Sequence, residues 1–439
     1  MHLKIHRGTK EIGGSCVELS NDKSRIILDH GMPLVKPGGQ EGEDFNFQEY
    51  KEIPGAELVE LGILPDIPGL YSWDTDNSLV DGVLISHAHK DHYGFVQYIH
   101  PKVPIYASEG AAALIKVSEL FLPDPVVIRP PKILPKSKPF QIGPFNITAF
   151  LVDHSAPDAL AFEVETGGKK LFYSGDIRGH GRKRTLFERM IQNPPKNVTA
   201  LLMEGSTIGR HKQKYRDENA VENGIAELIA ARKNMALLFC SSQNLDRIVS
   251  AYKAAIRTNR ILVIDLYTAF VLDALKIISS SIPQYYWDRV RVKFWHYHRE
   301  CLINAGYENF VAAVAKSGNG IKMDELIAQR KNILMLAKAN SLLPKILTRL
   351  PDFDGLSIIW SLWNGYLTGE DILSRVCAEL DLTIEQIHTS GHASINDLQR
   401  LANAINPQFL IPIHTFHPYD YEQFGIPVRI LEDGETMEL

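Results

Sequence analysis

The residues best suited to chemistry lie in one short stretch, Ser86-His87-Ala88-His89-Lys90-Asp91-His92, which directly follows the apolar run Gly82-Val83-Leu84-Ile85. The pattern is H-x-H-x-D-H, which places three imidazoles and one carboxylate within six residues. Imidazole nitrogen and carboxylate oxygen are ligands that zinc and similar divalent ions prefer. The stretch therefore predicts a metal site that activates water for hydrolysis. A histidine-rich surface loop without metal is the alternative.

Similar side chains recur along the chain where apolar strands are expected to end. Asp29, His87, Asp176, Glu204 and His414 each follow such a strand, and strand ends are where reactive groups converge in a sheet-based enzyme. His87 and His89 could face one ion, with Asp91 and His92 turned toward a second and Asp176 between the two. We expect two divalent metal ions, zinc or alternatively manganese, held by seven residues: His87, His89, Asp91, His92, His154, Asp176 and His414.

The rest of the chain must form elements that position these residues. Its 439 residues are 45% apolar and 23% charged, which is ordinary globular composition and enough for two or three domains. The hairpin at Gly167-Gly168 and the strands before Asp176 and Glu204 belong to a first α/β part. From about residue 215 to 375, helical patterns alternate with short apolar strands, which predicts a second unit with a parallel sheet. Residues 34–76 are rich in Gly, Pro and acids and are expected to form a long surface loop.

The seven expected metal ligands resemble the ligand set of the metallo-β-lactamase superfamily. The resemblance implies an αββα sandwich of two sheets with outer helices, and Asp29 matches an aspartate that supports the metal loop. The stretch between Glu204 and His414 resembles the β-CASP insertion of nucleic-acid-processing members, with ribonuclease J-type enzymes among the similar families. It carries Glu204 after a strand, the turn His388-Thr389-Ser390-Gly391-His392-Ala393-Ser394 and His414. The expected domains are 1–208 with 376–439, and an inserted α/β domain at 209–375.

Three residues are expected to act in catalysis. His392 is the candidate proton donor or phosphate contact, since an imidazolium can do both near neutral pH. Glu204 would orient its ring and raise its pKa, and Asp91 joins them from the metal loop. A turn histidine and an acid at a helix start are the alternatives without a catalytic role.

A phosphate cradle is expected where a strand leads into a helix at Ser241, Ser242 and Asn244, because small hydroxyls and backbone N–H groups at a helix start suit an anion. Ordinary helix capping is the alternative, and Ser390 and Ser394 of the turn are assigned to the same role. Phe294–His298 could stack bases, although a buried strand is expected there. Basic residues that flank the motif loops could line an entry groove for a polyanion: Lys169, Lys170, Arg178, Arg182, Lys183, Arg184, Arg210, Lys212, Lys214 and Arg216.

Together these features predict a metal-dependent hydrolase that cleaves RNA phosphodiester bonds, as a 5′ exonuclease, an endonuclease or both. A DNA nuclease of repair, a small-molecule hydrolase of the same fold and a non-catalytic RNA-binding protein are the alternatives. The net charge of −5 provides no global basic field, and four scattered cysteines exclude a C-x-x-C zinc or redox pair. With neither a signal peptide nor a membrane span evident in the sequence, a cytoplasmic protein is expected, and a homodimer is conceivable.

Overall fold

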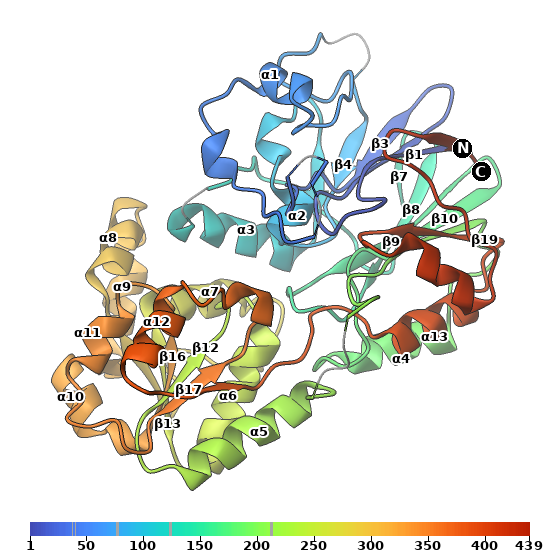
Figure 1. Cartoon of the computed structure of the whole chain (residues 1–439). Coiled ribbons are helices and arrows are strands. Elements are labelled where there is room, and N and C mark those ends of the chain that lie inside the picture. Colours follow the sequence, from blue (N-terminus) through green and yellow to red (C-terminus); the bar gives the residue numbers. More distant parts are fainter. Residues whose placement is uncertain (37, 40, 76–78, 123–124, 211–213) are drawn as a thin grey trace. The chain divides into compact units, whose positions relative to one another are not determined.

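The computed structural model describes the whole chain except residues 37, 40, 76–78, 123–124 and 211–213. The chain divides into two compact units. Unit 1 comprises Met1–His211 and Gly391–Leu439, and unit 2 comprises Lys212–Ser390. Unit 1 is thus built from two segments of chain that are separated in sequence by the whole of unit 2 (Figure 1).

Unit 1 contains two mixed sheets. In spatial order the first has strands β20 (Thr436–Glu438), β1 (His2–Arg7), β2 (Cys16–Ser20), β3 (Arg25–Leu28), β4 (Gly82–Leu84), β5 (Ile105–Ala107) and β6 (Lys132–Ile133). The second has β19 (Phe409–Ile413), β11 (Ala200–Glu204), β10 (Lys169–Tyr173), β9 (Leu160–Thr166), β8 (Phe145–Leu151) and β7 (Phe140–Ile142). The hairpin predicted at Gly167-Gly168 is present and joins β9 to β10.

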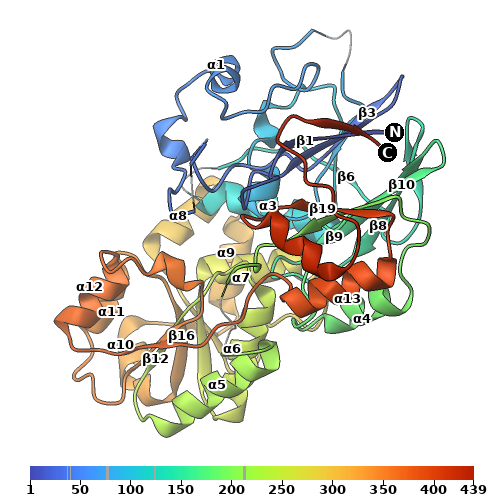
Figure 2. The same cartoon turned by 45° about the vertical axis from the view of Figure 1, so that its right-hand side comes forward.

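The two sheets pack face to face and helices cover their outer faces. One apolar cluster joins residues of both sheets, such as Leu3 and Ile5 of β1 with Phe162 and Leu171 of the second sheet. A second cluster joins the other face of the second sheet to α4 (Arg184–Gln192) and α13 (Ile395–Ile405), which lie side by side in Figures 1 and 2. In the first sheet, α2 (Lys90–Tyr93) and α3 (Glu109–Phe121) connect the parallel strands β4, β5 and β6. The predicted αββα sandwich is confirmed.

Unit 2 is a doubly wound α/β unit around one parallel sheet. In spatial order its strands are β15 (Gly320–Ile321), β14 (Val290–Lys293), β13 (Ile261–Asp265), β16 (Ile333–Ala337), β12 (Ala236–Phe239), β17 (Ser357–Trp360) and β18 (Ile384–Gln386). Its helices are α5 (Glu218–Ala231), α6 (Leu245–Arg257), α7 (Leu266–Leu275), α8 (His296–Asn304), α9 (Glu308–Lys316), α10 (Met323–Ala328), α11 (Leu343–Leu347) and α12 (Ile372–Glu379). The central strands β12 and β16 are buried along their whole length, as expected for a sheet covered on both faces.

The structure places some elements differently from the sequence predictions. The boundary expected between residues 375 and 376 falls inside α12, and unit 2 extends to Ser390 because β18 pairs in parallel with β17. The segment expected as a buried strand at Phe294–His298 instead starts α8, because β14 ends at Lys293. Segment 34–76 contains the helix α1 (Gly55–Glu60) and a short 3-10 helix at Phe47–Glu49, so it is more regular than expected. Among the described residues, no helix has both the length and the apolar character needed to cross a bilayer.

Candidate metal centre

The histidine stretch forms the turn between β4 and α2. His87 follows the strand, His89 takes the N-cap position, and the helix that begins at Lys90 carries Asp91 and His92 in its first turn. The short helix therefore turns the last two ligands away from the first two. Gly31 permits this packing, since a β-carbon at this residue would lie 1.7 Å from the carbonyl oxygen of Asp91.

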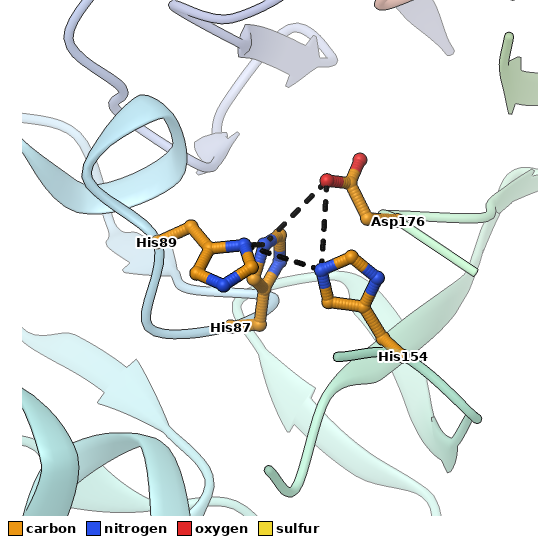
Figure 3. Close-up of side chains that lie close together, drawn as sticks. All are labelled: His87, His89, His154 and Asp176. Carbon is orange, nitrogen blue, oxygen red and sulfur yellow. Dashed lines mark hydrogen bonds and ion pairs between the residues drawn. The ribbon is translucent and has the colours of Figure 1, made fainter. Parts of the chain in front are cut away.

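The predicted metal ligands gather into two groups that share one aspartate. The first group is His87, His89, His154 and Asp176, which point toward one another in Figure 3. The second is Asp91, His92, Asp176 and His414. In each group the candidate ligand atoms all lie within 4.8 Å of one another. All seven predicted ligands thus lie together, from four different segments of unit 1.

Distances in the first group are short for uncoordinated side chains. The Nδ1 atom of His89 lies 3.1 Å from Nε2 of His87 and 3.2 Å from Nε2 of His154. Asp176 Oδ2 lies 3.6 Å from Nε2 of His87 and 3.9 Å from Nε2 of His154. Three imidazole nitrogens and a carboxylate oxygen therefore surround one small volume.

The second group also gathers around Asp176. The Nε2 atom of His92 is 3.3 Å from Asp176 Oδ2, and Nε2 of His414 is 3.8 Å from Asp176 Oδ1. Asp91 Oδ2 completes the group, at 3.6 Å from Nε2 of His414. Because His414 faces the second carboxylate oxygen of Asp176, this aspartate can serve both groups.

Asp29 supports the histidine stretch 86–92 through hydrogen bonds on the side away from Asp176. Its fully buried carboxylate accepts hydrogen bonds from the backbone N–H of Ser86 (2.7 Å), the Ser86 hydroxyl (2.7 Å) and the Tyr173 hydroxyl (2.8 Å). It also lies 2.8 Å from Nδ1 of His92, which directs the Nε2 atom of that ring toward Asp176. A carboxylate behind a ligating histidine fixes its tautomer and ring orientation. The position agrees with the supporting role expected for Asp29.

His414 is also oriented through neighbouring groups. Nδ1 of His414 accepts a hydrogen bond from the backbone N–H of Gly13 (3.2 Å) and lies 3.0 Å from the Ser15 hydroxyl. His154 follows Asp153, whose carboxylate binds the N–H of Gly181 (2.8 Å) and the buried guanidinium of Arg178 (3.3 Å). The contacts of His414 leave its Nε2 to face Asp176, while those of Asp153 fix the backbone next to His154.

The electrostatics of the cluster fit a divalent cation. Burial lowers the pKa of His87, His89, His154 and His414, which favours the neutral ring whose lone pair can bind a metal. Burial raises the pKa of Asp176, but the surrounding histidines outweigh it and hold that pKa well below its usual range. Neither carboxylate oxygen of Asp176, nor Nε2 of His92 or His414, has a hydrogen-bond partner among the described residues. Buried polar atoms without such partners are rare, and a metal ion would satisfy all of them.

Glu204 and His392 lie beside this cluster. Nδ1 of His392 is 3.6 Å from both Glu204 Oε1 and Asp176 Oδ2. Burial lowers the pKa of His392, but these two carboxylates raise it more, so the net shift is upward. Glu204 is itself fixed, since it accepts hydrogen bonds from the N–H of Ser206 (2.9 Å) and of Ala393 (3.3 Å). The structure therefore brings the expected pair together.

The residues expected to bind phosphate belong to both units. Ser394 is the N-cap of α13, and Asn244 is the N-cap of α6, accepting from the N–H of Arg247 (3.1 Å). Ser241 accepts from the N–H of Gln243 (3.2 Å), and Ser242 lies 2.7 Å from the Thr268 hydroxyl, both in unit 2. Ser390 is the last residue of unit 2.

The expected basic groove loses two of its members. Arg178 is fully buried against Asp153 and is therefore not part of a surface. Lys170 is paired with Glu163 and Glu165, which offset its charge. Lys212 lies outside the described residues. The remaining basic residues provide less positive surface charge than the sequence suggested.

Sequence reasoning missed several supporting residues, among them Ser86, Tyr173, Gly13 and Arg178. The signal was local for Ser86 and Tyr173, which immediately precede the motif residues His87 and Ser174-Gly175-Asp176. His30 was unexplained from sequence and is a core residue: burial lowers its pKa to about 3, and its Nδ1 lies 3.6 Å from the Cys16 sulfur.

Comparisons with known proteins agree with this geometry. Residues 71–232 match a family model described as a β-lactamase superfamily domain. Residues 378–417, from the end of α12 to just past His414, match one described as a Zn-dependent metallo-hydrolase RNA specificity domain.

Similar proteins extend the match to most of the chain. Ribonuclease J of Helicobacter pylori (strain B128) is 22% identical over 98% of this chain and 60% of its own length. Ribonuclease J of Sinorhizobium meliloti is 26% identical over 88% of this chain and 67% of its own length. The chain thus spans about 60% of the length of the Helicobacter relatives.

A solved structure has the same fold over the full chain. A protein of unknown function from Enterococcus faecalis V583 superposes with a TM-score of 0.78, at 22% identity, over 100% of this chain and 99% of that one. The two family matches and the buried His/Asp cluster support a resemblance to the metallo-β-lactamase superfamily and its ribonuclease J-like β-CASP branch.

Proposed function

We propose that this protein is a metal-dependent ribonuclease that hydrolyses phosphodiester bonds of RNA. The observation that carries the proposal is the pair of His/Asp groups that share Asp176, with Glu204 and His392 beside them. The match of residues 378–417 to an RNA specificity domain supports RNA as the substrate. Ribonuclease J proteins among the relatives support the same class of reaction.

We assign one divalent ion, zinc or alternatively manganese, to each group. His87, His89 and His154 would hold one ion, Asp91, His92 and His414 the other, and Asp176 would serve both. Such ions, when bound, supply the Lewis-acid chemistry that activates water and neutralises charge on phosphate oxygens.

His392 is assigned as the proton donor for the leaving oxygen. A proton on its Nδ1 is stabilised by the carboxylates of Asp176 and Glu204, each 3.6 Å away. The ring can then be an imidazolium near neutral pH, and its other N–H is available to donate. Glu204 acts as a positioning residue, because it binds the backbone N–H of Ala393, which neighbours His392.

The test compares substrates that differ in one feature each. Metal-reconstituted protein is incubated with single-stranded RNA that carries a 5′-monophosphate, a 5′-triphosphate or a 5′-hydroxyl, and with DNA of the same sequence. We expect cleavage of RNA, with release of mononucleotides from the monophosphate substrate for 5′ exonuclease action and internal fragments for endonuclease action. Cleavage of DNA but not RNA would move the assignment to a DNA nuclease. A protein with its metals bound that cleaves neither polymer would contradict the proposal.

A further inference from the structure

Two hydroxyl groups, those of Tyr173 and Ser15, connect Asp29 to the expected metal ligand His414. The Tyr173 hydroxyl donates to Asp29 Oδ2 at 2.8 Å and is hydrogen-bonded to the Ser15 hydroxyl. The Ser15 hydroxyl in turn lies 3.0 Å from Nδ1 of His414. None of these four residues is more than 1% exposed, so bulk water does not compete for the contacts.

This series of hydrogen bonds crosses between the two sheets of unit 1. Asp29 follows β3 and Ser15 precedes β2 in the first sheet, whereas Tyr173 ends β10 and His414 follows β19 in the second. Asp29 and His414 both have positive φ angles, 59° and 55°, which are uncommon for residues other than glycine. The backbone is thus held in a less favourable conformation at both ends of the series, as occurs where surrounding contacts fix a functional side chain.

Metal binding by His414 depends on which ring nitrogen carries the proton. A neutral imidazole has one N–H, so an ion on Nε2 requires the proton on Nδ1. Among the described residues, the groups within hydrogen-bond distance of Nδ1 are the backbone N–H of Gly13 at 3.2 Å and the Ser15 hydroxyl. A backbone N–H can only donate, and it therefore suits the opposite tautomer. The Ser15 hydroxyl is the group that can accept the Nδ1 proton of the metal-binding tautomer.

Tyr173 determines whether the Ser15 hydroxyl accepts or donates. An ionised carboxylate can only accept, so the Tyr173 proton points to Asp29 and the Tyr173 oxygen is left to accept from Ser15. The Ser15 proton is then directed to Tyr173, and the Ser15 oxygen accepts from Nδ1–H of His414. Burial and the charge of Asp29 raise the pKa of Tyr173, so the phenol keeps the proton that it donates.

Asp29 reaches two other ligands over shorter paths. Nδ1 of His92 lies 2.8 Å from its carboxylate. Nδ1 of His87 lies 3.0 Å from the Ser86 hydroxyl, which donates to the same carboxylate at 2.7 Å. In both rings Nε2 faces the aspartate that the two ligand groups share. His414 has the same arrangement, with two hydroxyls in place of none or one.

We infer that Tyr173 and Ser15 are positioning residues that hold His414 in its metal-binding tautomer. Through them, Asp29 determines which nitrogen carries the proton in ligands of both groups. The inference rests on the two-metal site of the proposed function. Loss of either hydroxyl should weaken binding of the ion in the second group and leave the ion of the first group little changed.

Ser15→Ala and Tyr173→Phe each remove one hydroxyl with little change of shape. Metal-free protein is titrated with zinc in competition with a chromophoric chelator, which gives one dissociation constant for each ion. We expect either variant to raise one constant at least about tenfold and the other less than about twofold, since groups that orient a ligating histidine contribute about 10–100-fold in affinity. Ser118→Ala and Tyr71→Phe are the controls, because they remove buried hydroxyls that donate to backbone carbonyls of other residues in unit 1.

The double variant tests whether Tyr173 acts through Ser15. If it does, Tyr173→Phe should weaken zinc binding little further when residue 15 is already alanine, because the path to His414 is then broken. Losses of affinity that multiply in the double variant would show two independent structural effects and would contradict the inference.

Proton NMR of the cobalt(II)-loaded protein reports the tautomer itself. The Nδ1 proton of a histidine that binds cobalt through Nε2 gives a strongly shifted signal that disappears in D₂O. Ser15→Ala should show one such signal fewer than wild type in H₂O, because the His414 proton has lost its acceptor and exchanges with solvent. Ser118→Ala should keep the full set. An unchanged circular dichroism spectrum shows that each variant folds.

Unchanged constants for both ions and an unchanged set of exchangeable signals in Ser15→Ala and Tyr173→Phe would overturn the inference. Cleavage assays separate this result from failure of the proposed function. If wild type and both variants cleave RNA and bind zinc equally well, the inference is wrong while the ribonuclease stands. If none of them cleaves RNA but the second ion still depends on the two hydroxyls, the positioning role stands and the ribonuclease proposal fails. A wild type that binds fewer than two ions would overturn both.

Discussion

At the scale of residues, the metal cluster is organised by two aspartates with different tasks. Asp176 faces both ligand groups, with Oδ2 3.6 Å from Nε2 of His87 in the first group and Oδ1 3.8 Å from Nε2 of His414 in the second. Asp29 touches neither group's centre but collects four hydrogen-bonding contacts behind the loop, including 2.8 Å to His92. A change at Asp176 should therefore disturb both groups. A change at Asp29 should lower metal affinity by altering the orientation of the His92 ring.

We predict that His392→Ala retains the bound metal but loses turnover. The ring lies 3.6 Å from Glu204 and is not a member of either ligand group. Removal of a general acid typically costs about 10²–10⁴-fold in rate. Metal content measured by mass spectrometry, beside kcat on RNA, checks the prediction. Loss of metal from this variant would instead make His392 a ligand.

We predict that Asp29→Asn lowers metal affinity by about 10–100-fold, the usual effect of changing a group that orients a ligating histidine. The amide keeps the shape but removes the charge that faces Nδ1 of His92. Titration of the metal-free protein with zinc, followed by calorimetry, measures the change. Asp22→Asn, on the exposed turn before β3, is the matched control. Equal affinity in both variants would show that Asp29 only supports the fold.

At the scale of elements, the first sheet contains a charged cluster that should make stability depend on pH. Glu18 of β2 binds His6 of β1 at 2.9 Å and Arg25 of β3 at 2.8 Å. Burial raises the pKa of Glu18, but the hydrogen bonds from these two residues outweigh it and lower the pKa to about 2. The unfolded value is about 4.3, so the cluster stabilises the fold fully above about pH 4.3, and this contribution is lost as the pH falls toward 2.

Glu18→Gln should therefore cost about 1–3 kcal/mol of stability at pH 7, and the difference from wild type should shrink below about pH 4. Urea unfolding at a series of pH values measures both effects. Glu60→Gln, at the exposed end of α1, should change little at any pH. A difference that stays constant down to the lowest pH at which the protein folds would refute the assignment.

The elements show how far sequence could predict this molecule. The strand ends before His87, Asp176, Glu204 and His414 were predictable because an apolar run and a reactive residue are adjacent in sequence. The contact of Tyr173 with Asp29 was not, because it joins residues 144 positions apart whose pairing depends on how two sheets stack. The end of unit 2 at Ser390 was also missed, since it depends on the pairing of β18 with β17.

At the scale of the whole molecule, metal and stability should be linked. The cluster joins four segments of unit 1, so an ion that binds there favours the folded state. Removal of metal by a chelator, from a solution with about 100-fold excess over Kd, should cost about 2.7 kcal/mol and lower the melting temperature of unit 1 by about 5–10 °C. Differential scanning calorimetry checks this, with Asp176→Asn as the control that should melt low with or without metal. An unchanged melting temperature of the wild-type protein after addition of the chelator would contradict the metal site.

The division of unit 1 into two chain segments has a consequence for biosynthesis. The ribosome delivers β1 to β11 first and β19 and β20 only after all of unit 2. His87, His89, His154 and Asp176 are then already made, whereas His392 and His414 are not. Domains tend to fold as they emerge. Unit 2 can therefore fold while the second ligand group still lacks His414. The nascent protein should therefore acquire its second ligand group, and with it any hydrolytic activity, as one of the last events of its synthesis.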